Sequence, residues 1–276
     1  MSRVLIDYIK NCLNPVNTTE FVETDVFVKS VYDNLVQDGI YICNVLTEED
    51  KHELSDCIQI NNIYIIRKVI KEIEWLNKDG SFSWSNGTQP LYRRLLPPPI
   101  ETVNHTLIIS EILKSYTNTF NNKLIYLEYG VRHGANFNTM VELNSTGINI
   151  GVDLKILPHL SSRHFNDNYQ LYEMLTDTFS MTVLPLLKPD IAFIDADHCS
   201  ESVIKDFTYI FRYLKVGGYI ILHDTYPCSP EYLDVNGCSD CYKTPIYIKS
   251  NLIPMVDLSI LTLPLNPGVS IIKKLR

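Results

Sequence analysis

The sequence contains no long hydrophobic run. No apolar stretch approaches the roughly 18 to 20 residues that cross a bilayer. The first ten residues, Met1 to Lys10, also lack a basic segment followed by an apolar core. We therefore expect no membrane partner, no export and a cytoplasmic location.

Basic residues are also in deficit. The 276 residues include 24 Lys plus Arg against 32 Asp plus Glu, which gives a net charge of -8. Binding to nucleic acid relies on positive charge against phosphates, so we expect no nucleic-acid partner. The hydrophobic content of 45% provides enough material for a large core and excludes disorder as the dominant state.

Cysteine is too sparse and scattered for a disulfide framework. The chain has seven cysteines, an odd number, so reduced thiols are expected. Cys238 and Cys241, with Cys228 ten residues earlier, could form a partial zinc knuckle or a redox pair. A zinc site normally needs a second pair of ligands, and a redox motif should open a helix directly after a strand. Neither feature is present in the sequence, so we expect neither role.

The first part of the chain has helical patterning. Apolar residues from Phe27 to Leu35 recur at helical spacing, Thr47 before three acids is typical of an N-cap, and Ile60 to Leu76 carries a second stripe. The turn-rich stretch from Asn77 to Gln89 is the best candidate linker. This predicts a mainly helical N-terminal extension over residues 1–94, acting as a lid or a homo-oligomer contact, followed by a second domain over 95–276.

From Lys123 onward, short β-branched runs alternate with helical stripes, as is typical of a parallel sheet with crossover helices. An amphipathic helix around 103–113 precedes this part. Strands are expected at 124–128, 149–153, 191–195 and 219–223, and a helix at 201–214. Residues 258–265 and 269–275 flank a turn and predict an antiparallel hairpin. The fold class is therefore α/β: a Rossmann-like doubly wound sheet, mostly parallel, with a C-terminal antiparallel hairpin.

The turn after the first of these strands indicates a cofactor site. Gly130 and Gly134 would let a ligand approach the backbone closely, and Asp153 ends the next strand, where a carboxylate can bind a ribose. Together they point to an adenosine-containing cofactor. The acidic Glu128 opens the turn and would repel a diphosphate, so a positively charged cofactor fits better.

The third and fourth strands both end in acidic residues. Asp195 and Asp224 should meet at the carboxyl edge of the sheet and could hold one hard cation such as Mg²⁺. His223 or the Thr225 hydroxyl would complete its ligands. His198, three positions after Asp195, is a natural general base.

Two of these groups also have structural explanations. Asp197 could cap the following helix, and His223 could be a histidine satisfied at a strand end. The convergence of four acidic or imidazole groups on one edge favours a site.

These motifs carry a family resemblance. From about Leu95 to the C-terminus, the sequence resembles the class I S-adenosylmethionine-dependent methyltransferases. The loop from Glu128 to Gly134 resembles their first motif, and Asp153 resembles their ribose-binding acid. Residues 194–198 with 217–225 are similar to the macrocin-type and cephalosporin-biosynthesis-type small-molecule O-methyltransferases.

The resemblance implies S-adenosylmethionine as cofactor and a small hydroxylated acceptor, in particular a sugar or a glycosylated compound. It implies metal-ligand roles for Asp195 and Asp224, and Thr176 and Asp177 would line the adenine pocket. Some relatives use the acid at the Asp197 position as the base, so this residue is the alternative to His198.

Two other functions use the same sheet. A nucleotide-binding, NAD-type oxidoreductase would need a diphosphate cradle, which Glu128 argues against. A non-catalytic methyltransferase-like scaffold would not need the acids retained at both strand ends.

Overall fold

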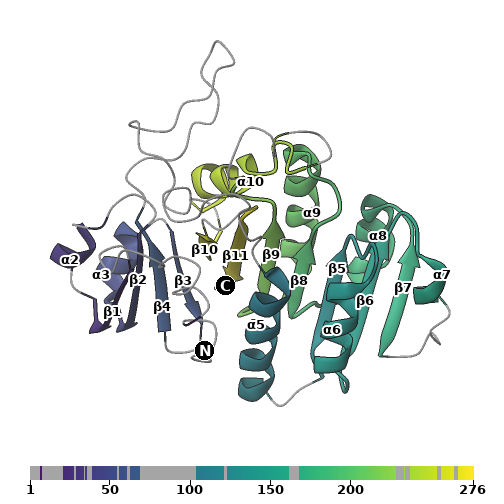
Figure 1. Cartoon of the computed structure of the whole chain (residues 1–276), viewed down its shortest axis with the longest axis horizontal. Helices are drawn as coiled ribbons and strands as arrows, with labels where there is room; N and C mark the ends of the chain where they lie inside the picture. Colours follow the sequence, from purple (N-terminus) through teal and green to yellow (C-terminus); the bar gives the residue numbers. More distant parts are fainter. Residues whose placement is uncertain are drawn as a thin grey trace, which may run out of the picture.

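Figure 1 shows the computed structural model of the chain. The structure describes residues 7, 21–27, 29–33, 35, 39–54, 56–60, 63–68, 104–120, 123–161, 168–227, 233, 237–253, 256–263 and 267–276. The candidate linker from Asn77 to Gln89 lies outside the described residues.

One sheet of eleven strands runs through the described residues, in the order β1-β2-β4-β3-β10-β11-β9-β8-β5-β6-β7. Its parallel part consists of β5 (Ile125–Tyr129), β6 (Ile148–Asp153), β7 (Tyr169–Glu173), β8 (Ile191–Ile194) and β9 (Tyr219–His223). The chain moves outward from β5 through β6 to β7 and then returns to β8 on the other side of β5. This reversal creates a crevice at the carboxyl ends of β5 and β8, where ligands bind in open α/β sheets.

The C-terminal strands close this part of the sheet. β10 (Leu258–Leu263) pairs antiparallel with β11 (Val269–Lys274), and β11 pairs antiparallel with β9. The antiparallel hairpin predicted for these residues is therefore present. Its turn includes Pro267, which reaches the pocket described below.

Helices cover both faces of the parallel strands (Figure 1). α5 (His105–Phe120) and α6 (Ala135–Leu143) bury apolar residues in one core, and α8 (Thr176–Thr182) and α9 (Ser200–Tyr213) bury theirs in the other. α9 buries Val203, Phe207 and Ile210 at helical spacing, as its sequence pattern predicts. The remaining short helices are α7 (Pro158–Ser161), η3 (Leu184–Leu186), α10 (Lys243–Tyr247) and η5 (Ile248–Leu252).

The described part of the N-terminal extension is mainly strand, so the prediction of a mainly helical segment is wrong for these residues. It contains β1 (Phe21–Val26), β2 (Ile40–Val45), β3 (Cys57–Ile60) and β4 (Ile63–Arg67), with the short helices α2 (Lys29–Asp33) and α3 (Glu48–Glu53) between strands. Thr47 does cap α3, since its side chain accepts a hydrogen bond from the Asp50 amide. β4 lies between β2 and β3 and is buried on both faces, so its apolar run suits an interior strand as well as a helix.

These N-terminal strands continue the same sheet. β3 pairs with β10 through Cys57 and Ile260, and the Thr262 amide donates a hydrogen bond to Asp56. The Asp56 carboxylate is fully buried, where it pairs with Arg67 and with Lys249 of η5, 3.3 Å away. The division of the chain at residue 94 into two domains stays a prediction.

Candidate functional site

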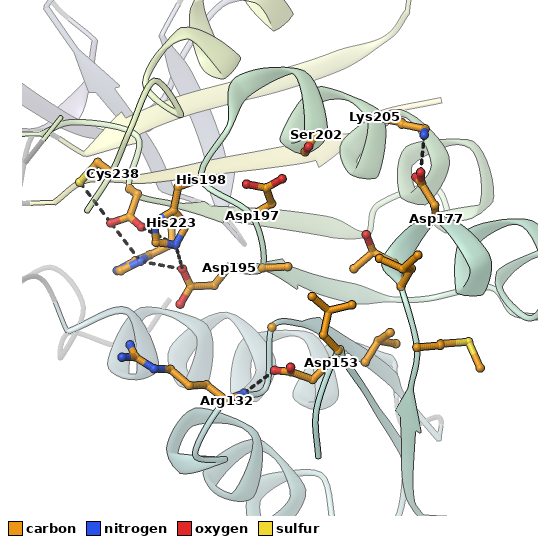
Figure 2. Close-up of a pocket in the computed structure, with 18 of the residues that line it drawn as sticks. Arg132, Asp153, Asp177, Asp195, Asp197, His198, Ser202, Lys205, His223 and Cys238 are labelled. Carbon is orange, nitrogen blue, oxygen red and sulfur yellow. Dashed lines mark hydrogen bonds and ion pairs between the residues drawn. The ribbon is translucent and has the colours of Figure 1, made fainter. Parts of the chain in front are cut away.

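A pocket of about 840 Å³ opens at the carboxyl ends of the parallel strands. Figure 2 shows residues from the ends of β5, β6, β8 and β9 facing one another across it. Its position matches the crevice created by the reversal of strand order, and its volume is in the range of small-ligand sites, about 300 to 1,000 Å³. This pocket is the candidate active site.

Gly130 lets the ends of β5 and β8 come together at the pocket. Its φ is +88°, and a Cβ at this position would lie 2.2 Å from the carbonyl oxygen of Asp195. A side chain at this position would force the two strand ends apart. Gly134 is the N-cap residue of α6 and packs against Leu160, and it is not among the residues that line the pocket.

The structure places Glu128 in the core and not in the pocket. Its Oε2 accepts hydrogen bonds from the Tyr126 hydroxyl and the Asn136 amide, both at 2.6 Å. Burial raises the pKa of Glu128 to about 8, although both hydrogen bonds oppose the shift. The carboxyl group is buried and does not line the pocket, so the predictions that Glu128 binds the cofactor and repels a diphosphate there are wrong.

Asp153 lies on the pocket wall at the end of β6. Its Oδ2 accepts a hydrogen bond from the Arg132 amide at 2.7 Å, and its Oδ1 accepts one from the Lys155 amide at 3.1 Å. These bonds fix the carboxylate between two loops, with remaining lone pairs available to a ligand. Figure 2 shows Asp153 on the side of the pocket away from Cys238.

Thr176 and Asp177 also line the pocket, from the first turn of α8. Asp177 forms an ion pair with Lys205 of α9, across the pocket wall (Figure 2). Lys205 and Ser202 line the pocket too, and sequence reasoning missed both because they lie on an ordinary amphipathic helix.

The acidic residues after β8 and β9 meet as predicted. Asp195, His198 and Asp224 each offer one ligand atom within 4.8 Å of the others, a spacing suited to one cation. The Nε2 atom of His198 lies 3.2 Å from Asp224 Oδ2 and 3.7 Å from Asp195 Oδ1. The Nδ1 atom of His198 faces the carbonyl oxygen of Gly237.

His223 lies against both carboxylates. Its Nδ1 is 3.1 Å from Asp195 Oδ1 and 3.4 Å from Asp224 Oδ1. Its ring also meets the edge of His105, which stacks on Phe193. His105 begins α5, and no motif in the sequence marked it.

These contacts shift several pKa values. Burial raises the pKa of Asp195, but His223 and His198 offset this effect and hold it well below its ordinary value. Burial lowers the pKa of His223, but the charges and hydrogen bonds of Asp195 and Asp224 together outweigh it and raise the pKa to about 10. The interaction with Asp195 raises the pKa of His198 to about 9. The two histidines and two aspartates therefore form a mutually neutralising cluster.

Two other predicted site residues, Asp197 and Thr225, are not members of this cluster. The exposed Asp197 lines the pocket, and its Oδ1 accepts a hydrogen bond from the Cys199 amide at the start of α9. Thr225 is buried, its Oγ1 accepts a hydrogen bond from Ser270, and it is not among the residues that line the pocket. The structure therefore does not bring Thr225 to the carboxylate cluster.

Both cysteines of the Cys238-to-Cys241 motif lie beside this cluster. The Cys238 thiol donates to Asp224 Oδ1 at 3.4 Å, and the Cys241 thiol donates to the carbonyl oxygen of His223 at 3.3 Å. Both side chains are buried, and neither forms a disulfide bond. Cys228 lies outside the described residues.

Comparison with known proteins finds a family match in the central part of the chain. Residues 127–225 match a family model described as a methyltransferase domain. An uncharacterized protein of Acanthamoeba polyphaga mimivirus is 28% identical over 137 residues, which cover 44% of this chain and 62% of that relative. The methyltransferase resemblance is thereby confirmed, and its narrower macrocin-type branch stays a prediction.

The chain also shows limited similarity to solved structures of methyltransferases. A Podospora anserina methyltransferase bound to S-adenosylhomocysteine is 15% identical, with a TM-score of 0.45 over 64% of this chain and 91% of that chain. MycE, a methyltransferase from the mycinamycin biosynthetic pathway in complex with Mg and S-adenosylhomocysteine, is 13% identical. Its TM-score is 0.46 over 88% of this chain and 74% of that chain. Among the described residues, no helix is both long and apolar enough to cross a membrane.

Proposed function

We propose that this chain, in which residues 127–225 match a methyltransferase-domain family, transfers a methyl group from S-adenosylmethionine to a hydroxyl oxygen of a small molecule. The observation that carries the proposal is one continuous pocket, lined at one side by Asp153 and at the other by the cluster around Asp195 and Asp224. A cofactor and an acceptor could thus occupy the two sides of the same cavity.

The cofactor side consists of Gly130, Asp153, Thr176 and Asp177. Asp153 would accept hydrogen bonds from the ribose hydroxyls, because its carboxylate is fixed at the strand end where such hydroxyls bind. Gly130 lines the pocket beside Asp195, where the methionine part would lie. Thr176 and Asp177 would border the adenine.

The acceptor side has a donor set that fits a divalent cation, because Asp195 and Asp224 supply the carboxylate oxygens that hard cations prefer. When bound, the cation would lower the pKa of an acceptor hydroxyl. His223 and Cys238 would hold the carboxylates in place, since both contact Asp224 Oδ1.

A proton must leave the acceptor hydroxyl as the methyl group is transferred. His198 and Asp197 both line this side of the pocket, and either could accept the proton. The methyl group of the sulfonium is already activated, so holding oxygen, carbon and sulfur in line supplies most of the acceleration.

The test is a screen of sugars, nucleotide sugars, glycosides and phenols with methyl-labelled S-adenosylmethionine. The proposal predicts that label appears in an O-methyl ether, in amounts equal to the S-adenosylhomocysteine formed. Label transferred only to nitrogen or carbon would contradict oxygen as the acceptor atom. Hydride transfer with NAD by the same preparation would support the oxidoreductase alternative.

A further inference from the structure

We infer that His198 is a third protein ligand of the divalent cation, and that the site therefore prefers a transition-metal ion such as Mn²⁺ to Mg²⁺. The donor set would be one imidazole nitrogen and two carboxylate oxygens, from Asp195 and Asp224. The inference rests on the proposed function only for the presence of a cation at this edge of the sheet.

The first argument is the position of the His198 Nε2 atom. It lies 3.2 Å from Asp224 Oδ2 and 3.7 Å from Asp195 Oδ1. Two ligands that are each about 2.1 Å from one ion lie roughly 3.0 to 3.5 Å apart. The ring nitrogen is thus close to the place that a third ligand of the same ion would take.

The second argument is the hydrogen bond on the other side of the ring. The Nδ1 atom of His198 faces the carbonyl oxygen of Gly237. A carbonyl oxygen can only accept, so in the neutral ring Nδ1 carries the hydrogen and Nε2 carries the lone pair. Metal-bound histidines typically have this arrangement, with the second nitrogen donating to a carbonyl or a carboxylate. The Nε2 atom faces the two carboxylates, so its lone pair would be available to a cation that takes the place of the Nε2 proton.

The third argument is the orientation of Asp224. His223 and the Cys238 thiol both contact its Oδ1, at 3.4 Å each, whereas Oδ2 faces His198. The two neighbours thus hold one carboxylate oxygen and leave the other for an ion. His223 is not a member of the set of three ligands, and it acts as a positioning residue.

This donor set determines which ion is favoured. Mg²⁺ favours oxygen ligands and retains several waters, whereas an imidazole nitrogen suits the later divalent metals. With His198 bound to the ion, Asp197 is the remaining carboxylate on this side of the pocket that could accept the acceptor's proton.

The experiment measures the affinity of the full chain for Mn²⁺. The concentration of unbound Mn²⁺ is read from its electron paramagnetic resonance signal, and Mg²⁺ is added as a competitor. Electron spin echo modulation then detects any ¹⁴N nucleus bound to the ion. We expect nitrogen coupling in the wild type and an affinity at least about ten-fold higher for Mn²⁺ than for Mg²⁺. His198→Ala should abolish the coupling and weaken Mn²⁺ binding by about ten- to a hundred-fold.

Two control variants should keep both the coupling and the affinity. His159→Ala removes an exposed imidazole that contacts the His133 carbonyl outside the pocket. Asp197→Asn changes a pocket residue that is not in the donor set. His198→Glu provides a second test if His198→Ala does not fold, since it should bind Mg²⁺ and Mn²⁺ without nitrogen coupling.

Nitrogen coupling that survives in either His198 variant would overturn the inference, as would a wild-type protein that binds Mn²⁺ with no coupling or prefers Mg²⁺. S-adenosylmethionine binding distinguishes this failure from that of the proposed function. A chain that binds the cofactor but fails the Mn²⁺ test contradicts the ligand assignment alone. A chain that passes the Mn²⁺ test but binds no cofactor contradicts the methyltransferase proposal.

Discussion

At the residue scale, Asp224 combines a strained backbone conformation with a carboxylate that three side chains contact. Its φ of 58° lies in the left-handed region, which costs a non-glycine residue about 1 kcal/mol or more. The carboxylate it positions is contacted by His198, His223 and Cys238. Such strain persists where the surrounding contacts fix it, and these contacts belong to the proposed cation site.

Glu128 gives a prediction about stability and pH. Burial raises its pKa to about 8, above the value of about 4.3 for a free glutamate. Between these values the folded state holds a proton that the unfolded state has lost, so this contribution to stability falls as the pH rises. The loss is at most about 1.4 kcal/mol per pH unit.

Glu128→Gln should remove this dependence while it keeps an oxygen acceptor for Tyr126 and Asn136. Urea unfolding at pH 5 and pH 8 should show a smaller decline in the variant than in the wild type. An equal decline in both proteins would mean that Glu128 does not carry the buried proton.

Asp197 gives a prediction about the reaction. If it accepts the acceptor's proton, Asp197→Asn should lower the methyl-transfer rate by about a hundred-fold. Binding of S-adenosylmethionine and Mn²⁺ should be nearly unchanged, because the lost interaction acts on the acceptor. If Asp197→Asn keeps most of its activity, Asp197 is not the general base, and His198 becomes the candidate that accepts the proton.

The sequence predicts which acidic residues end the strands but not which face of the sheet each side chain occupies. Asp195 and Asp224 could be predicted because parallel strands end at a common edge. Glu128 could not be placed, because successive residues of β5 face opposite sides and the pattern does not say which side α6 covers. His105 reaches the cluster only through the packing of α5, which no local pattern records.

At the element scale, the close approach of β5 and β8 depends on Gly130. Gly130→Ala should cost more than about 2 kcal/mol of unfolding free energy, because a Cβ would meet the Asp195 carbonyl at 2.2 Å in addition to the positive φ. Gly217→Ala is the matched control, since Gly217 has a φ of +81° but no atom within 4 Å of an added Cβ. Urea unfolding of both variants checks the difference, and equal costs would exclude the steric contact.

Several elements could be predicted from periodicity, and others could not. The strands from β5 to β9 were recognisable as buried β-branched runs, except β7, which has tyrosines and polar residues and is only partly buried. β4 was interpreted as part of a helix because a continuous apolar run fits both structures. Its pairing with the adjacent β3 is local, and its pairing with β2 is the long-range contact that makes it an interior strand.

At the scale of the whole molecule, Asp56 links the N-terminal strands to the C-terminal ones. Its buried carboxylate contacts Arg67, Lys249 and the Thr262 amide. Asp56→Ala should destabilise the fold by about 3 to 5 kcal/mol, because two buried cations lose the carboxylate that neutralises them. Asp257→Ala breaks an exposed pair with Arg276 and should cost less than about 1 kcal/mol in the same unfolding assay. Similar costs for the two variants would contradict the linking role of Asp56.

The central claim is that the pocket binds S-adenosylmethionine with Asp153 at the ribose. Calorimetric titration of the full chain with S-adenosylmethionine and with NAD tests it most directly. We predict one binding site per chain for S-adenosylmethionine, weaker or no binding of NAD, and a loss of about ten-fold or more in S-adenosylmethionine affinity in Asp153→Ala. Binding of NAD but not of S-adenosylmethionine, or an unchanged affinity in a correctly folded Asp153→Ala, would contradict this claim.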